Sequence, residues 1–195
     1  MTARHLGNVL TQWVVAILLL SVGRSSIASI VVNGGFETGA FTGWSLSGNT
    51  GFTSVVAGAA AHSGNYSAQL GPVGSEGFIT QNLPTTAGTN YVLTYWLGND
   101  GGAPNEFTVI WNGGVVSDQL NTSSFAYTLF TLNVTATGVS TPLTFGFRQD
   151  PNFLHLDDIS VDAGTAVPEP ASLMVWALLA IAAGGFAIRR RRVAK

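Results

Sequence analysis

The stretch from residue 29 to residue 164 alternates short apolar runs with clusters of Gly, Asn, Ser and Thr. In residues 91–97, YVLTYWL, every odd position is Tyr or Leu, so these side chains share one face of an extended chain. Residues 143–148, LTFGFR, repeat the pattern with Leu and Phe at the odd positions. A period of two is typical of strands that bury one face, and no helical periodicity of useful length interrupts it.

Runs of this kind predict strands at 30–32, 44–46, 52–56, 66–70, 78–81, 91–97, 106–111, 125–134, 143–148 and 153–161. Asn112-Gly113 predicts a tight hairpin turn that joins the run ending at Trp111 to Val115. About ten short strands separated by frequent turns predict an all-β domain over 29–164, an antiparallel β-sandwich. The absence of a repeat at a fixed period argues against a propeller or a solenoid.

The first 28 residues have the organisation of a signal peptide. Arg4 and His5 form a weakly basic start, and an apolar run of about ten residues follows at 13–22. Ser26-Ile27-Ala28 offers small residues at both positions that a signal peptidase reads, which predicts cleavage after Ala28. The alternative, an uncleaved membrane anchor, requires a longer apolar run to span a bilayer.

The C-terminal end differs from this. Residues 171–188 contain no charge over 18 positions, a length that just spans a bilayer core. Four arginines follow at once, Arg189, Arg190, Arg191 and Arg192, in a basic tail that runs to residue 195. We therefore predict a transmembrane helix at 171–188, with the tail in the cytoplasm and the β domain outside. A buried core helix is the alternative, but the run is apolar on every face.

Before this helix, the linker at 165–170 ends in Pro168, Glu169 and Pro170, which can join neither a helix nor a sheet ladder. A Pro-Glu-Pro motif, an apolar helix and an arginine cluster in this order resemble the PEP-CTERM sorting signal. The resemblance implies export by a Gram-negative bacterium, inner-membrane anchoring before processing by an exosortase, and then a cell-surface or extracellular location.

Charge separates the domain from the two ends. Between residues 29 and 167, the single basic residue Arg148 stands against nine Asp and Glu side chains, which gives a formal charge of −8. An acidic surface repels phosphate backbones, so nucleic acid is an unsuitable partner. The chain has no cysteine, which excludes disulfides and thiolate metal sites.

A second resemblance brackets the domain. Residues 33–39, NGGFETG, followed by Gly43-Trp44, resemble the start of galactose-binding-like jelly rolls, to which carbohydrate-binding modules of the CenC type belong. Residues 156–161, LDDISV, resemble the last strand of the same group. The resemblance implies a jelly-roll sandwich whose first and last strands lie close together.

In that group, a glutamate at the position of Glu37 and an aspartate at the position of Asp157 or Asp158 often hold a structural calcium ion. Three carboxylates brought together repel one another unless a hard cation lies between them, and Ca²⁺ prefers oxygen ligands. We therefore expect Glu37, Asp157 and Asp158 to hold a structural Ca²⁺. The alternative is that one aspartate is solvated and the others cap turns.

A polysaccharide site needs exposed aromatic faces flanked by polar side chains. Trp96 and Trp111 lie in predicted strands, and the polar loop at 98–105 carries Asn99 and Asp100. We take these four residues as candidate ligand-binding residues, whereas Trp44 lies in the opening motif and is expected in the core. The alternative is that the tryptophans are all core residues and the loop is only a connection.

Catalysis has little support in the sequence. His62 and His155 have no metal-ligand spacing, and no nucleophile elbow is present. Adjacent residues of a regular strand point to opposite faces, so Asp157 and Asp158 are not expected to flank one glycosidic bond. We predict that the protein is not an enzyme.

Two functions remain. The first is an exported protein of the cell surface, the biofilm or the extracellular polysaccharide matrix whose sandwich binds carbohydrate, with exposed aromatic residues beside a groove. The second is a structural or adhesive surface protein without a small-molecule site, in which the aromatic residues are all buried.

Overall fold

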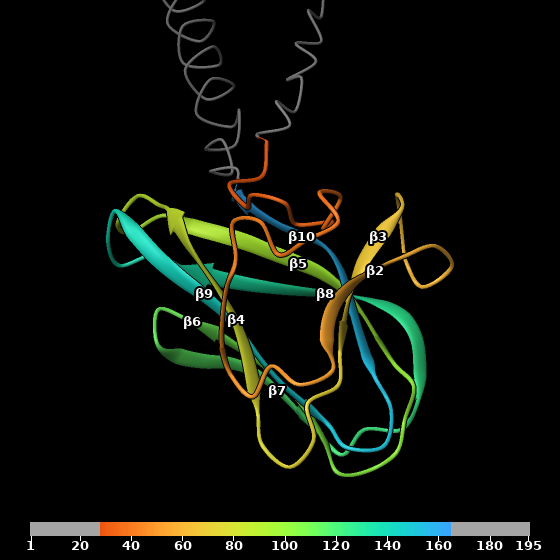
Figure 1. Cartoon of the computed structure of the whole chain (residues 1–195). Helices are drawn as coiled ribbons and strands as arrows, with labels where there is room; N and C mark the ends of the chain where they lie inside the picture. The colour runs from red at the N-terminus through yellow and green to blue at the C-terminus, as the bar shows by residue number, and fades with distance from the viewer. Residues whose placement is uncertain (1–27, 165–195) are drawn as a thin grey trace, which may run out of the picture.

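The computed structural model describes residues 28–164, which form ten strands and no helix. The strands are β1 (Ser45–Gly48), β2 (Thr53–Ala57), β3 (Tyr66–Leu70), β4 (Gly77–Pro84), β5 (Asn90–Asn99), β6 (Asn105–Trp111), β7 (Gly114–Leu120), β8 (Phe125–Thr135), β9 (Ser140–Gln149) and β10 (Leu154–Ala163). They form two layers that face each other (Figure 1).

Each layer is a five-stranded sheet. The first sheet has the order β1-β4-β9-β6-β7 and the second the order β2-β3-β10-β5-β8, with every pair antiparallel. The predicted all-β jelly-roll sandwich is confirmed. One predicted strand, 30–32, is irregular, although the amide of Ile30 donates to the carbonyl of Val161 in β10. The tenth strand is instead β7, the second arm of the predicted hairpin.

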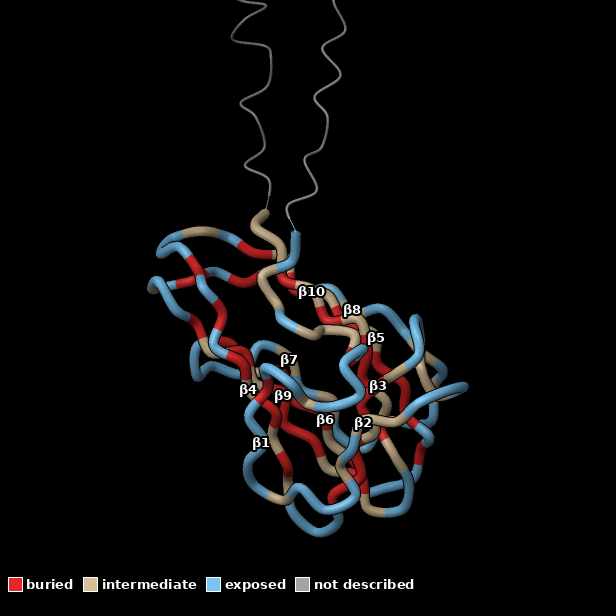
Figure 2. The backbone as a smooth tube through the Cα atoms, turned by 45° about the horizontal axis from the view of Figure 1, so that its top comes forward, coloured by how far each residue is buried: buried red, intermediate tan, exposed pale blue. Residues whose placement is uncertain are grey.

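The core forms where the predicted alternation turns apolar side chains inward. On β5, Tyr91, Leu93, Tyr95 and Leu97 are buried, and Leu143, Phe145 and Phe147 of β9 face them from the first sheet. Tyr95 packs edge-on against Phe145, with ring centroids 5.5 Å apart. The buried residues therefore lie along the strands of both layers, where Figure 2 marks them in red.

The hairpin between β6 and β7 turns at Asn112 and Gly113, which have φ angles of 51° and 81°. Positive φ at both central residues is the requirement of a type I′ turn, and Asn-Gly meets it with the least strain. The predicted turn is confirmed.

The two ends of the described chain lie side by side at one end of the sandwich (Figure 1). The hydroxyl of Ser29 accepts a hydrogen bond from the amide of Val161, and the amide of Ile159 donates to the carbonyl of Gly34. The opening motif therefore lies against the last strand, as the second resemblance implies.

The predicted signal peptide up to residue 27, the linker, the transmembrane helix at 171–188 and the arginine tail lie outside the described residues. Among residues 28–164, no helix has the length and apolar character needed to cross a membrane.

Candidate functional site

The two adjacent aspartates of the last strand point toward the same loop. On β10, Asp158 and Ile159 together lie opposite the single residue Tyr95 of β5, which makes a β-bulge. Asp158 takes a positive φ of 48° there. The expectation that Asp157 and Asp158 face opposite sides is wrong, because the extra residue turns both carboxylates to one side.

Both carboxylates hold the loop between β2 and β3, residues 58–65. Asp157 is fully buried, and its Oδ2 accepts the backbone amides of His62 at 2.8 Å and Ser63 at 3.3 Å. Asp158 contacts the side chains of the same two residues, through Nδ1 of His62 at 2.7 Å and the hydroxyl of Ser63 at 2.8 Å. The loop is therefore fastened over the outer face of the second sheet.

Glu37 fastens the far end of this loop. Its Oε1 accepts the amides of Asn65 at 2.9 Å and Tyr66 at 3.1 Å. Gly64 leaves room for this contact, since a Cβ at that position would lie 2.3 Å from Oε1 of Glu37. The three predicted calcium ligands thus converge on one loop.

The fit of these residues to calcium can be judged at Gly35, which lies among them. A Cβ built on Gly35 would lie 3.4 Å from an oxygen of Asp158, 3.6 Å from one of Asp157 and 3.8 Å from Cγ of Glu37. Within residues 28–164, however, no three His, Cys, Asp or Glu side chains are arranged to hold a metal ion. Oxygens of Glu37 and Asp157 accept amides instead, and the calcium site stays a prediction.

Burial changes the acidity of this cluster. The pKa of Asp157 is raised from 3.8 to about 6, mainly because the carboxyl is buried and also because the charge of Asp158 lies beside it. The amides of Asp158, Ser63 and His62 act in the opposite direction by donating to the carboxylate. Asp157 is therefore a buried acid with a pKa of about 6.

Beside the carboxylates lies a group of aromatic rings. The imidazole of His62 stacks on the half-buried indole of Trp96, with centroids 3.8 Å apart and planes 17° apart. Tyr127 of β8 meets His62 edge-on at 5.3 Å and His155 of β10 at 6.4 Å. The outer face of the second sheet is thus aromatic where β10, β5 and β8 run together.

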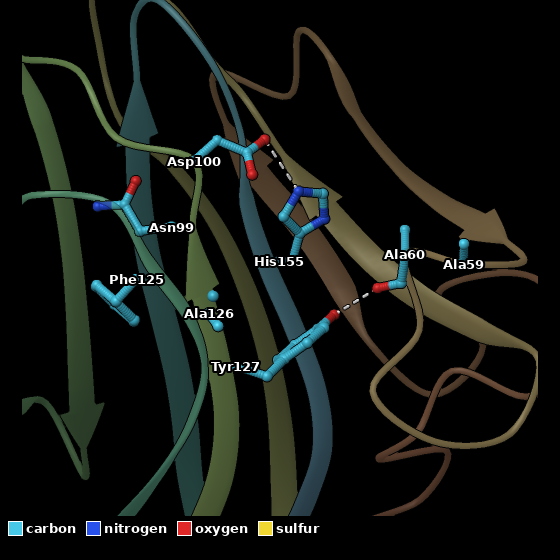
Figure 3. A pocket seen from close by; sticks show the side chains of 9 residues that line it. Ala59, Ala60, Asn99, Asp100, Phe125, Ala126, Tyr127 and His155 are labelled. Carbon is cyan, nitrogen blue, oxygen red and sulfur yellow. Dashed lines mark hydrogen bonds and ion pairs between the residues drawn. The ribbon is translucent and has the colours of Figure 1, made fainter.

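A hollow of about 450 Å³ opens at the end of this group (Figure 3). Strands β5, β8 and β10 and the β2–β3 loop supply its lining, which consists of Ala59, Ala60, Gly98, Asn99, Asp100, Phe125, Ala126, Tyr127 and His155.

Polar groups are fixed around the hollow. Asp100 contacts Nε2 of His155 at 3.1 Å, and the hydroxyl of Tyr127 donates to the carbonyl of Ala60 at 2.8 Å. The other ring nitrogen of His155, Nδ1, is buried and has no hydrogen-bond partner among the described residues. Burial and the surrounding acids raise the pKa of Tyr127 to about 12, so the phenol stays protonated.

The structure separates the four predicted ligand residues. Trp96 and Asp100 lie on the outer face, and Asp100 lines the hollow. Trp111 is wrong as a ligand residue: the residue is only 5% exposed, and its Nε1 donates to the carbonyl of Thr135. Asn99 is also buried, and its amide group is hydrogen-bonded to Thr122, Gly101 and Gln149. It shapes the wall of the hollow.

Tyr127, Phe125 and His155 are not among the candidate ligand-binding residues that the sequence indicates. Their strand periodicity was visible, but their meeting depends on β10 and β8 both lying beside β5, which a single sequence does not show.

One aromatic ring, that of Phe78, also lies on the outer face of the first sheet. The half-buried ring of Phe78 on β4 lies over two glycines, because a Cβ on Gly48 or on Gly146 would lie 2.9 Å from it. Arg148 of β9 pairs with Asp150 at 2.7 Å through two hydrogen bonds. This face has an aromatic ring and charges.

Residues 166–192 match the family model of the PEP-CTERM protein-sorting motif. The chain carries a PEP-CTERM sorting signal. The matched range includes Pro168, Glu169 and Pro170 and the arginines Arg189 to Arg192, so the first resemblance is confirmed. The PEP-CTERM signal marks an exported protein that is processed by an exosortase. No curated protein matches the chain by sequence.

Solved structures share the fold of the domain. The carbohydrate-binding module TmCBM61, solved with β-1,4-galactotriose, has a TM-score of 0.54 and 19% identity, over 71% of this chain and 100% of that one. A family 16 carbohydrate-binding module has a TM-score of 0.51 and 19% identity, over 68% and 99%. The K1 cleaved adhesin domain of Lys-gingipain from Porphyromonas gingivalis W83 has a TM-score of 0.55 and 13% identity, over 67% and 96%.

Proposed function

We propose that this exported protein binds polysaccharide through its sandwich domain, and that the hollow between β5, β8, β10 and the β2–β3 loop holds a sugar unit. The observation that carries the proposal is the meeting of Tyr127, Asp100 and His155 around one hollow on an aromatic face. Sugar sites combine a ring for C–H contacts with fixed polar groups for hydroxyls.

The polar groups suit hydroxyl ligands. The Asp100 carboxylate is half exposed and can accept a hydrogen bond from a sugar hydroxyl while it keeps its contact with His155. This half-exposed carboxylate is the charged group of the hollow that a sugar hydroxyl can reach.

The fold supports the proposed carbohydrate binding, because carbohydrate-binding modules are among the structures similar to this domain. Such modules bind without performing chemistry, which favours a non-catalytic role. We further propose that the apolar run at 171–188 anchors the chain in the inner membrane of a Gram-negative bacterium until an exosortase cleaves near Pro168-Glu169-Pro170. The cleaved protein is then a component of the cell surface or of the extracellular matrix, for example of a biofilm.

A glycan array probed with residues 28–164 tests the sugar site. Binding to one polysaccharide class is expected, and Tyr127→Ala and Asp100→Ala should each weaken it at least several-fold. Tyr127→Phe keeps the ring and removes only the bond to Ala60, so it should retain binding if the ring face is what matters.

Phe78→Ala, on the opposite face, is the matched control. If it abolishes binding while Tyr127→Ala does not, the ligand lies on the first sheet and the proposed site is wrong. If no glycan is retained at all, the domain is better explained as a structural or adhesive module, a role that the similarity to an adhesin domain also favours.

A further inference from the structure

The four edges of the two sheets differ in how well they are protected. An edge strand presents unpaired N–H and C=O groups that can pair with another chain, and proteins limit this with short strands, charges or bulges. Strand β1 has four residues and β2 has five. Strand β7 has a bulge beside Val115 and carries Asp118.

Strand β8 has none of these protections along most of its length. It runs for 11 residues, Phe125–Thr135, with β5 on one side and no strand of residues 28–164 on the other. It contains no charged residue and no proline. Its only irregular pairing lies between Leu97 and Asn99 of β5, opposite the first residues of β8. From Thr128 to Thr135 the strand pairs regularly with β5. Its outer edge is free as far as Val134, since the carbonyl of Thr135 accepts the Nε1 hydrogen of Trp111.

Apolar side chains gather along the same side of the molecule. Trp111 of β6 donates to Thr135 of β8, so the β7 edge of the first sheet and the β8 edge of the second lie on one side. Large apolar side chains are exposed on these two strands, namely Val115 at 62%, Val116 at 39%, Leu120 at 61% and Leu129 at 48%. Exposed apolar side chains do not stabilise a monomer, but a partner that covers them removes them from water.

Charge indicates which part of the surface a second copy can approach. The domain has a formal charge of −8, so two copies repel each other over most of their surfaces. The stretch from residue 119 to residue 147, which includes all of β8, contains no charged residue. The β8 edge is therefore where a second copy can approach at the lowest electrostatic cost.

We propose that β8 pairs antiparallel with β8 of a second copy, around a two-fold axis at Thr131, the midpoint of the free stretch from Thr128 to Val134. An antiparallel strand pair is self-complementary, as a two-fold interface requires. Thr131 then faces itself, and Leu129 of each copy faces Asn133 of the other. The second sheets of the two copies then join into one continuous sheet, and the dimer has two sugar-binding hollows, one in each copy.

Cross-linking of the full-length chain in detergent tests the pairing. The chain has no cysteine, so Thr131→Cys provides a unique site for a short bis-maleimide. Its control is Ser54→Cys, exposed on β2 at the opposite edge of the same sheet. We expect several-fold more covalent dimer from Thr131→Cys than from Ser54→Cys. Equal yields, as a dimer formed through the apolar tail would give, overturn the proposal.

Sedimentation of the full-length chain in the same detergent gives a second readout. The wild type and Ser54→Lys should be dimers, whereas Thr131→Lys should be a monomer with an unchanged circular dichroism spectrum, because it sets two like charges opposite each other. A monomeric wild type, or a dimer that survives Thr131→Lys, overturns the pairing. Glycan binding by Thr131→Lys should be unchanged per chain, which separates this inference from the sugar site.

Discussion

The imidazole of His62 covers one face of the Trp96 indole, with the two ring centroids 3.8 Å apart. His62 is held there by Asp158, which contacts its Nδ1, and by Asp157, which accepts its amide. The most exposed tryptophan of the domain is thus covered by a loop that three carboxylates fasten. A ligand can reach this face of Trp96 only if the loop moves.

Replacing His62 with alanine should uncover Trp96. We expect a red-shifted tryptophan emission and stronger quenching by acrylamide in residues 28–164, because the other tryptophans of this segment, Trp44 and Trp111, are buried. The melting temperature should fall only slightly, since the backbone bond from His62 to Asp157 remains. Trp96→Phe in the same background is the control, and it should remove the added quenching. If the added quenching persists in the variant with both His62→Ala and Trp96→Phe, the exposed indole belongs to Trp44 or Trp111.

Asp157 should make the fold less stable as the pH rises. Its pKa is about 6 in the fold against an ordinary value of 3.8, so the folded state holds the proton more tightly than the unfolded state. The free energy of unfolding is then highest below pH 3.8 and decreases up to about pH 6, by at most about 3 kcal/mol for this shift. Urea denaturation across this range, in chelator, measures the slope.

The matched variant is Asp157→Asn, which cannot titrate. It should flatten the slope between pH 3.8 and 6, because the amide takes up no proton in either the folded or the unfolded state. Asp150 does not interfere, since its bond with Arg148 lowers its pKa to about 2 and its effect falls below this window. A slope unchanged in Asp157→Asn would assign it to another acid, such as Glu106, whose pKa burial also raises.

Local periodicity was enough to predict most of the fold. The odd positions of 91–97 and 143–148 do face the core, and Asn112-Gly113 does form the hairpin turn. The same alternation also predicts that Trp111 is buried, because it lies at an odd position of β6 like the buried Phe107 and Val109. Trp96 lies at an even position of β5, whose odd positions are buried, so it points outward. Side-chain orientation along one strand is thus readable from the sequence.

What the sequence could not provide are irregular and cross-strand features. The bulge at Asp158 inserts one residue and changes the parity of the last strand, and no residue type there signals it. The meeting of Tyr127, His155 and Asp100 requires the order β10-β5-β8, which depends on long-range pairing. The hollow therefore became visible only in three dimensions.

Gly34 should tolerate no side chain. A Cβ there would lie 2.0 Å from the carbonyl oxygen of Ile159, and the two backbones are tied by the bond from the Ile159 amide to the Gly34 carbonyl. Because the obstacle is backbone, it cannot rotate away, and Gly34→Ala should cost about 3 kcal/mol in urea denaturation. The control is Gly114→Ala on β7, where the nearest atom would lie at an ordinary 3.6 Å. Equal stability of the two variants would contradict the close approach.

Calcium should raise the melting temperature of the domain if Glu37, Asp157 and Asp158 bind it. Calcium at a hundred times its dissociation constant adds about 2.7 kcal/mol of stability, and a chelator removes this gain. Glu37→Ala should abolish the gain, but it also removes the acceptor for Asn65. Glu37→Gln separates the two roles, because it keeps an oxygen for this amide and loses the charge. The opposite result is a wild-type melting temperature that does not change with calcium, falls in Glu37→Ala and is restored in Glu37→Gln. It would show that Glu37 only accepts the backbone amides of the loop, since an amide oxygen accepts them equally well.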